Sequence, residues 1–457
     1  MKQSVLIMIL CVCLTAPSFT AFGQPLEEKN TPTEEAVKPE LNSDAAILMD
    51  ATTGEILYEK NSKNKMFPAS ITKVMTVLLA LENGNLNDTL TFSHDAVYSI
   101  EPGSAHIAMQ EGEQITLEQA LYGILLRSAN EVSNAVAEYV DGSTTAFAEH
   151  MTKRAKELGC ESTNFINANG LFDENHYTTA YDMAHIAKEL LKQDVYKTMM
   201  STTYYEIPPT NLQSEIRYLH GQHQMLNPNS IYYYEYATGG KTGYTSEALN
   251  TLVTFAKKGD TQLIAVVFKC NGAEHYVDTK ALFEYGFTNF QTAKVLSAAE
   301  FAKTVDVVEI YKKKTSSLGK ITVAPQEDVY QTIAVSKSLS DIQVDVNLPE
   351  TVYAPVTAGQ EVGTLAVKAN HEVLATVPLF AQASVAETPA ETRSLQEKEA
   401  KIKILKMGGL IFLGILLVFT ILFCIGRIAR HLKRKKRRKK RAAMRRRNHR
   451  NYSRSPR

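Results

Sequence analysis

An uninterrupted apolar segment near the C-terminus constrains this 457-residue chain more than any other feature. Residues 407–425 contain no charged side chain. A helix of nineteen such residues is about 28 Å long, which matches a bilayer core of about 30 Å. Backbone polar groups inside lipid must be satisfied internally, so a single segment of this kind has to be helical. The sequence therefore predicts a transmembrane helix within residues 402–426.

The charges of the chain are strongly segregated around this segment. Residues 427–457 hold 17 Lys and Arg and no acidic residue, whereas residues 24–401 hold 30 Lys and Arg and all 49 acidic residues. Cationic loops remain on the cytoplasmic side of membranes, so we expect a cytoplasmic tail and an extracytoplasmic body. The tail would also attract anionic lipid headgroups. A nucleic-acid partner is not expected, because Tyr452 alone could stack on a base and the tail directly follows the predicted span.

The N-terminus predicts export of the body to the same side. Lys2 precedes an apolar run from Val5 to Ala16, and the small residues around Ala21-Phe22-Gly23 form a cleavage site. We therefore expect a secretory signal peptide over residues 1–23. Residues 24–41 are rich in Pro and Glu and have little to bury, so they predict a flexible leader.

Three short motifs in a fixed order indicate chemistry. They are Ser70-Ile71-Thr72-Lys73, Ser128-Ala129-Asn130 and Lys241-Thr242-Gly243. A serine hydroxyl needs a base within hydrogen-bonding reach, and residues three apart on a helix are neighbours, so Lys73 could serve Ser70. Alone, each motif could be an ordinary helix start, loop or turn. Together they favour an acyl-transfer site with a second hydroxyl, an amide and a second cation.

The apolar periodicity predicts an α+β domain followed by a small β domain. A hairpin is expected over residues 45–50 and 55–59, and another over 249–255 and 262–268. The helix that carries Ser70 should run through Leu81 and end near Gly84. Further helices are expected over residues 117–126, 131–139, 144–158, 182–191 and 277–285. Short alternating runs predict an all-β domain over residues 291–383, and a polar stalk follows over 384–401.

Longer stretches around the motifs resemble the D-alanyl-D-alanine carboxypeptidases, the low-molecular-mass penicillin-binding proteins of the penicillin-binding protein 5/6 type. The resemblance runs from about residue 42 to about residue 385. It includes the segments 45–81, 158–171, 177–184 and 239–245. It implies a β-lactamase/transpeptidase-like fold over residues 42–290, with an antiparallel sheet and helices. It also implies a β-sandwich-like module after this domain.

The resemblance also implies a role for each motif residue. Ser70 would attack the substrate carbonyl, Lys73 would be its base, and Ser128 would relay a proton to the leaving amine. The substrate-binding residues would be Asn130, Lys241, Thr242, Gly243 and Tyr244, with the backbone amides of Ser70 and Tyr244 facing the oxyanion. Lys73 must be partly neutral to act as a base, which burial and a nearby Lys241 would favour. A β-lactam should acylate Ser70 in the same way as the substrate.

The expected substrates are peptidoglycan stem pentapeptides at the outer face of a bacterial membrane, from which the terminal D-alanine is removed. The alternatives are a β-lactamase or D,D-endopeptidase of the same fold, or a non-catalytic penicillin-binding receptor. A class A β-lactamase would use a glutamate in an E-x-x-L-N segment, which is absent between Asn130 and Lys241. Asp173 and Glu174 are the nearest carboxylate candidates, and both are typical of a solvated loop. Ala248-Leu249-Asn250 departs from relatives, which usually have glycine after the alanine.

Histidines and cysteines suggest no further chemistry. His220 and His223 have no third ligand placed with them, so neither a metal nor another cofactor is expected. Cys160 and Cys270 are the cysteines of the exported body, and two unpaired buried thiols are favoured over a disulfide.

Overall fold

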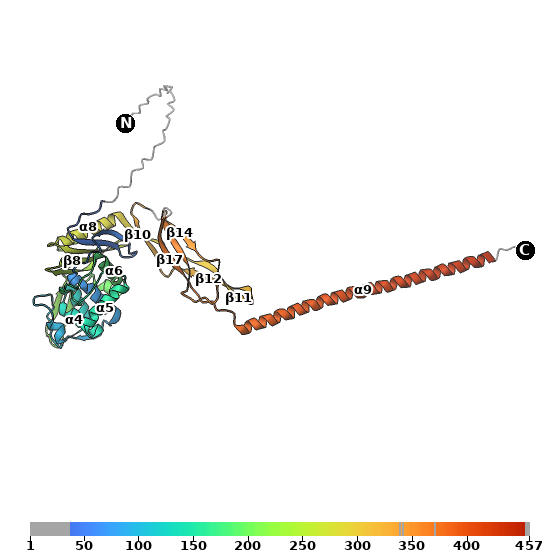
Figure 1. The fold of residues 1–457 in the computed structure, drawn as a ribbon, viewed down its shortest axis with the longest axis horizontal. Helices are drawn as coiled ribbons and strands as arrows, with labels where there is room; N and C mark the ends of the chain where they lie inside the picture. The colour runs from blue at the N-terminus through green and yellow to red at the C-terminus, as the bar shows by residue number, and fades with distance from the viewer. Residues whose placement is uncertain (1–36, 338–339, 341, 370–371, 453–457) are drawn as a thin grey trace, which may run out of the picture. The chain divides into compact units, whose positions relative to one another are not determined.

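The computed structural model describes residues 37–337, 340, 342–369 and 372–452, which form two compact units that divide at Gln291/Thr292 (Figure 1). The predicted signal peptide and most of the predicted leader lie outside the described residues.

The first unit is built on a five-stranded antiparallel sheet. Its strand order is β2-β1-β9-β8-β7, so β7 is an edge strand. Both predicted hairpins are confirmed, since β1 pairs with β2 and β8 pairs with β9. The strands are β1 (Ala45–Asp50), β2 (Ile56–Lys60), β7 (Ala237–Thr245), β8 (Leu249–Lys258) and β9 (Thr261–Cys270).

Helices cover both faces of this sheet, which explains the continuous apolar run in β1. Ala45, Ile47 and Met49 pack into the larger core, which includes residues of α1 and α6. Ala46 and Leu48 point to the opposite face and join a second core with residues of α8. Successive side chains of a strand face opposite ways, so a strand between two helical layers is apolar throughout. The helices are α1 (Lys73–Asn83), α2 (His94–Tyr98), α3 (Leu117–Arg127), α4 (Asn130–Asp141), α5 (Thr144–Glu157), α6 (Ala180–Leu190), α7 (Asp194–Met199) and α8 (Glu274–Asn289).

The helix predictions are confirmed except at the start of the first helix. Ser70 lies on a separate 3-10 turn, η1 (Ala69–Thr72), and α1 begins only at Lys73. Two short strand pairs, β3 (Thr89–Thr91) with β4 (Gln114–Thr116) and β5 (Tyr204–Ile207) with β6 (Arg217–His220), and the turn η2 (Gln224–Leu226) complete this unit among the described residues.

Helix caps show how local sequence positions these elements. Thr179 accepts a hydrogen bond from the backbone N–H of Asp182 at the start of α6. The Asp182 carboxylate accepts instead from the Ser162 N–H and the Thr163 hydroxyl, so it ties the preceding loop to the helix. A reciprocal capping box forms at α3 between Thr116 and Gln119.

The second unit begins with a β domain. Its six-stranded sheet has the order β14-β16-β17-β12-β11-β15, and β10 pairs separately with β13. The alternating runs of the sequence at residues 305–310, 333–335, 342–346 and 362–367 fall on β11, β13, β14 and β16, whereas β10, β12, β15 and β17 are not predicted. The strands are β10 (Phe290–Leu296), β11 (Lys303–Tyr311), β12 (Lys314–Ala324), β13 (Val329–Ala334), β14 (Ile342–Asn347), β15 (Thr351–Tyr353), β16 (Glu361–Ala369) and β17 (Glu372–Ala381).

The chain continues into one long helix, α9 (Ala390–Tyr452). It contains the apolar segment, and it is the one helix in the described part of the chain that is long and apolar enough to cross a membrane. The predicted stalk is thus helical from Ala390 onward. The start of α9 is attached to the β domain, because Arg393 pairs with Glu309 at 2.6 Å and Lys312 pairs with Glu397 at 2.8 Å.

The cysteine prediction is confirmed. Cys160 and Cys270 are both free and buried. Burial raises the pKa of each thiol to about 12, so neither is a thiolate at neutral pH.

Candidate active site

The first motif brings a lysine amine beside a serine hydroxyl. Ser70 lies on η1, and Lys73 is the first residue of α1, which follows directly. The Nζ of Lys73 donates a hydrogen bond to the Oγ of Ser70 over 3.0 Å. The predicted pairing is therefore present in the structure, although Ser70 precedes the α-helix.

Lys73 is fully buried and has two further acceptors. Its Nζ donates to the Oδ1 of Asn130 over 2.7 Å and to the backbone carbonyl of Asn169. Burial, followed by the positive charge of Lys241, holds the pKa of Lys73 well below its ordinary value. Glu131 acts in the opposite direction but is the smallest of the three influences. Both main causes favour the neutral amine.

The second motif lies at the junction of two helices. Ser128 ends α3 with a left-handed backbone, at φ 58°, and Asn130 begins α4. The backbone N–H of Asn130 donates to the carbonyl of Ala105 over 2.8 Å, which attaches the junction to the loop before β4. The Oγ of Ser128 is buried and has no hydrogen-bond partner among the described residues. A hydroxyl in that state can receive a substrate group without losing an existing bond.

The third motif lies on the edge strand β7. Lys241 is 2% exposed, and its Nζ donates to the carbonyl of Thr242 over 2.7 Å. Burial lowers the pKa of Lys241 to about 7. The Lys241 amine on this strand therefore gains or loses its proton near neutral pH. Tyr244, two residues beyond Thr242, is 62% exposed.

Gly243 allows this strand to approach Ser70. A Cβ at position 243 would lie 2.9 Å from the backbone nitrogen of Ser70 and 2.4 Å from the Oγ1 of Thr251. Thr251, on the neighbouring strand β8, donates its hydroxyl to the carbonyl of Pro68 over 2.8 Å. The edge of the sheet is thereby fastened to the segment that carries Ser70. All three motifs therefore converge on one site.

Two family models match successive parts of the chain. Residues 31–272 match the model for D-alanyl-D-alanine carboxypeptidase, and residues 290–387 match that for the C-terminal domain of penicillin-binding protein 5. The chain belongs to peptidase family S11, the D-alanyl-D-alanine carboxypeptidases. Members of this family act through an acyl-serine and bind β-lactams.

Individual relatives agree with this assignment. D-alanyl-D-alanine carboxypeptidase DacF of Bacillus subtilis is 34% identical over 74% of this chain and 84% of its own length. The enzyme DacA of Escherichia coli is 29% identical over 82% of this chain and 92% of its own length. The crystal structure of penicillin binding protein 5 from Haemophilus influenzae is 27% identical, with a TM-score of 0.65, and covers 77% of this chain and 100% of its own. The chain is a serine D-Ala-D-Ala carboxypeptidase.

The candidate site also contains residues that the sequence does not single out. Asn169 contributes its backbone carbonyl to Lys73, and its side chain donates to the Oδ1 of Asn134 over 3.0 Å. The Asn169-Gly170-Leu171 stretch resembles the family, but a main-chain contact leaves no mark on residue type. Asp173 and Glu174 do not contact Ser70 or Lys73. Asp173 accepts from the Asn175 N–H, and Glu174 is exposed.

A buried ionic network supports the loop beside the motif of Ser128. Arg217 binds both carboxylate oxygens of Glu113, at 2.6 and 2.8 Å. Its Nε also donates to the carbonyl of Ile107, while the N–H of Ile107 donates to Glu131. Both backbone groups of Ile107 are therefore held by buried charged side chains. This fixes the loop whose Ala105 carbonyl receives the Asn130 N–H.

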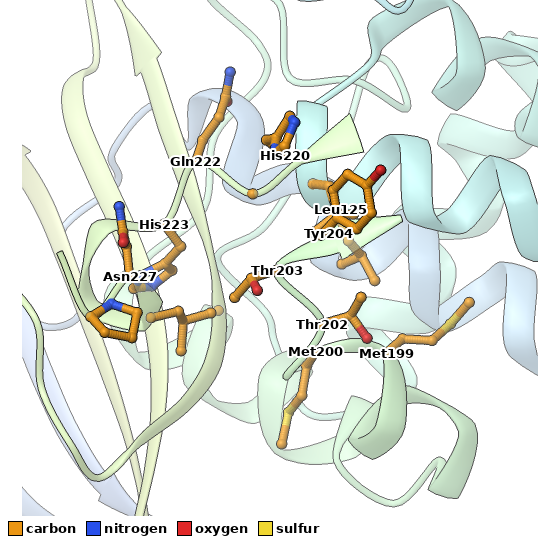
Figure 2. Close-up of a pocket in the computed structure, with 15 residues that line it drawn as sticks. Leu125, Met199, Met200, Thr202, Thr203, Tyr204, His220, Gln222, His223 and Asn227 are labelled. Atoms are coloured by element: carbon orange, nitrogen blue, oxygen red, sulfur yellow. The ribbon is translucent and has the colours of Figure 1, made fainter. Parts of the chain in front are cut away.

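The two histidines considered as metal ligands border a separate cavity of about 330 Å³ (Figure 2). His223 is buried, and its Nε2 lies 3.0 Å from the Oγ1 of Thr254. Burial, with a contribution from Lys241, lowers its pKa to about 3, so this ring is neutral in the physiological range. Gly240 of β7 lines the cavity, but none of the eight predicted site residues does. The described residues contain no group of three or more side chains able to hold a metal ion.

Proposed function

We propose that Ser70 is the acylated nucleophile of this carboxypeptidase and Lys73 its general base. The supporting observation is the set of three oxygen atoms within hydrogen-bonding distance of the Lys73 amine, which belong to Ser70, Asn130 and Asn169. A neutral amine has two N–H donors and one lone pair. If the donors bind Asn130 and Asn169, the lone pair faces the hydroxyl of Ser70. The site would then hold the base in the orientation that proton removal requires.

The reaction would proceed in two steps. Ser70 Oγ bonds to the carbonyl carbon of the penultimate D-alanine while its proton passes to Lys73. The C–N bond then breaks, and a proton relayed by Ser128 reaches the departing amine of the terminal D-alanine. In the second step a water loses its proton to Lys73, attacks the ester and frees Ser70. The backbone amides of Ser70 and Tyr244 would stabilise the oxyanion in both steps.

The carboxylate of the terminal D-alanine would bind Lys241 and the hydroxyl of Thr242. Lys241 is buried on the strand beside Ser70, where a charged amine attracts an anion strongly. Asn130 would hold the substrate amide, since it already lies beside Lys73. This arrangement explains why the family cleaves next to a free C-terminus.

The pH dependence of acylation follows from the two lysines. Lys73 must be neutral, so the second-order rate constant should rise as pH increases through its lowered pKa. Lys241 must be charged, so the rate should fall as pH increases through about 7. His176, whose Nε2 lies 2.8 Å from the Oγ1 of Thr72, and His223 have pKa values lowered by burial to about 4 and 3, so they should add no transition between pH 5 and 8. We expect a bell-shaped profile for penicillin acylation of Ser70. A profile that rises up to pH 10, as an ordinary lysine would give, would contradict this account.

We further propose that α9 crosses the membrane once, with the catalytic unit outside and the basic tail against anionic lipid in the cytoplasm. The charge asymmetry around the apolar segment supports this orientation. Protease added to intact protoplasts should remove the body and leave a protected fragment that carries a C-terminal tag. Loss of the tag before the cells are lysed would show the opposite orientation.

A further inference from the structure

The hairpin of β5 and β6 presents aromatic rings to solvent. Tyr204 pairs with His220 across the two strands, and Glu206 pairs with Tyr218, so these four side chains share one face of the hairpin. Tyr204 and Tyr218 are 43% and 58% exposed. Their rings are nearly parallel, at 12°, with centroids 6.4 Å apart, and the ring of His220 lies 5.0 Å from that of Tyr204. These three rings are called the aromatic platform below.

The opposite face of the hairpin holds the aromatic platform in place. Tyr205 stacks on Tyr122 with ring centroids 3.9 Å apart, and Leu219 is buried. Arg217 lies on the same inner face and forms the buried ion pair with Glu113. Because the hairpin is fixed in this way, a partner that binds the rings does not have to order the backbone beneath them. Tyrosine also has only two side-chain torsions to immobilise, so little conformational entropy is lost on contact.

The aromatic platform is continuous with the cavity of about 330 Å³ shown in Figure 2. Tyr204 and His220 both line this cavity, and so does Gly240, the residue before Lys241. The buried Nδ1 of His223, also in the lining, has no hydrogen-bond partner among the described residues. Further hydroxyl and amide groups of the lining come from Thr202, Thr203, Gln222 and Asn227. Flat rings and hydrogen-bonding groups therefore form one surface that reaches the strand of the third motif.

The charges of the hairpin indicate an uncharged partner. Residues 204–220 contain no lysine, and their single arginine, Arg217, is already paired. Glu206 accepts a hydrogen bond from the hydroxyl of Tyr204, and Glu215 is exposed. With neither a lysine nor an unpaired arginine, this surface attracts no anionic lipid or other polyanion. Exposed rings beside hydrogen-bonding groups suit a sugar instead, because its C–H groups pack on an aromatic face while its hydroxyls find polar partners.

We infer that the aromatic platform and the adjoining cavity bind the glycan strand of peptidoglycan, the polymer on whose peptides this family acts. The sugar rings would stack on Tyr204, Tyr218 and His220, and their hydroxyl and acetamido groups would bond to Glu206 and to the polar lining of the cavity. The strand is uncharged where a stem peptide is attached, because the stem is joined to the sugar carboxyl group as an amide. Contact with the strand would keep the enzyme where the local concentration of stems is high. The inference goes beyond the proposed function, since it gives this surface no step in catalysis.

Calorimetric titration with the hexasaccharide of N-acetylglucosamine tests the inference in the absence of any peptide. The protein is the full chain in a detergent without a sugar headgroup, because an alkyl glycoside would compete. We expect the wild type to bind the hexasaccharide and Tyr204→Ala/Tyr218→Ala to bind it about 5- to 100-fold more weakly, each ring contributing about as much as one aromatic pair. Tyr204→Phe/Tyr218→Phe keeps the rings and should lose less affinity. Tyr98→Ala/Tyr353→Ala removes two exposed rings outside the hairpin and should bind like the wild type.

Whole peptidoglycan provides a second measurement. The rate of D-alanine release from the polymer, divided by the rate from a free pentapeptide, should fall about 2- to 10-fold in Tyr204→Ala/Tyr218→Ala and stay at the wild-type value in Tyr98→Ala/Tyr353→Ala.

The outcomes separate this inference from the proposed function. Failure of the wild type to bind the hexasaccharide would overturn the inference, as would equal binding by Tyr204→Ala/Tyr218→Ala or an equal loss in Tyr98→Ala/Tyr353→Ala. If thermal unfolding shows that the double alanine variant of the hairpin is not folded, Tyr218→Ala replaces it: weaker binding supports the inference, and unchanged binding rejects it. If neither the polymer nor the pentapeptide is hydrolysed, the proposed function fails, and the titration still decides the inference.

Discussion

Replacing Lys73 with methionine should slow penicillin acylation of Ser70 by about 10²–10⁴-fold, the usual range for loss of a general base. The variant should remain folded. Methionine fills a similar volume, but it leaves the buried acceptors on Asn130 and Asn169 without their donor, so we expect a loss of about 1–3 kcal/mol in the free energy of unfolding with the fold retained. The measurements are the acylation rate with a labelled penicillin and the thermal unfolding midpoint of the same preparation.

Lys188→Met is the matched control for this experiment. Lys188 lies on α6, is half-buried, and also has a pKa lowered by burial, but it contacts none of the proposed catalytic groups. The control should acylate at the wild-type rate. If Lys73→Met also acylated at that rate, Lys73 would not be the base. If both variants lost activity together, the loss would reflect a general sensitivity to removal of lysine.

Substituting Gly170 with alanine should damage both stability and activity. Gly170 has φ +84°, and a Cβ there would lie 2.0 Å from the carbonyl oxygen of Ala69, the residue before Ser70. The left-handed backbone and the steric overlap together should lower the free energy of unfolding by about 2–5 kcal/mol. Displacing Ala69 would also move Ser70, and a shift of about 1 Å can reduce the rate about 10²-fold.

Gly142→Ala separates the two causes. Gly142 has a similar φ of +76°, but no heavy atom lies within 4 Å of the place that an added methyl group would take, so it should lose only the backbone contribution of about 1–2 kcal/mol. Its acylation rate should be unchanged. Chemical denaturation and acylation kinetics of both variants provide the comparison. Equal losses in stability, or full activity in Gly170→Ala, would refute the role of this close approach.

The sequence predicts those parts of the molecule that depend on residue type and spacing. Periodic apolar residues predict α3, α4, α5 and α6, and two pairs of strand-like runs predict the two hairpins of the central sheet. The three motifs place polar groups whose chemistry is visible from the side chains alone. The apolar residues 407–425 predict a long helix, because lipid leaves no alternative for the backbone.

The remaining features depend on contacts between distant segments. The 3-10 turn of Ser70 follows from Ala69, a non-glycine residue at φ 51° whose carbonyl packs against Gly170. Asn169 acts through its backbone, which no side-chain pattern reports. Glu113 and Arg217 are 104 residues apart and become partners only in the fold. The helical stalk is not predicted because its polar composition is typical of a linker, whereas contacts with Glu309 and Lys312 hold its first turns.

The most direct test of the central proposal is release of D-alanine from a D-Ala-D-Ala peptide by the full chain in detergent, with Ser70→Ala in parallel. We expect catalytic release by the wild type, loss of release in the variant, and a penicillin adduct that maps to Ser70. Release that persists in Ser70→Ala, or an adduct on another residue, would contradict the account.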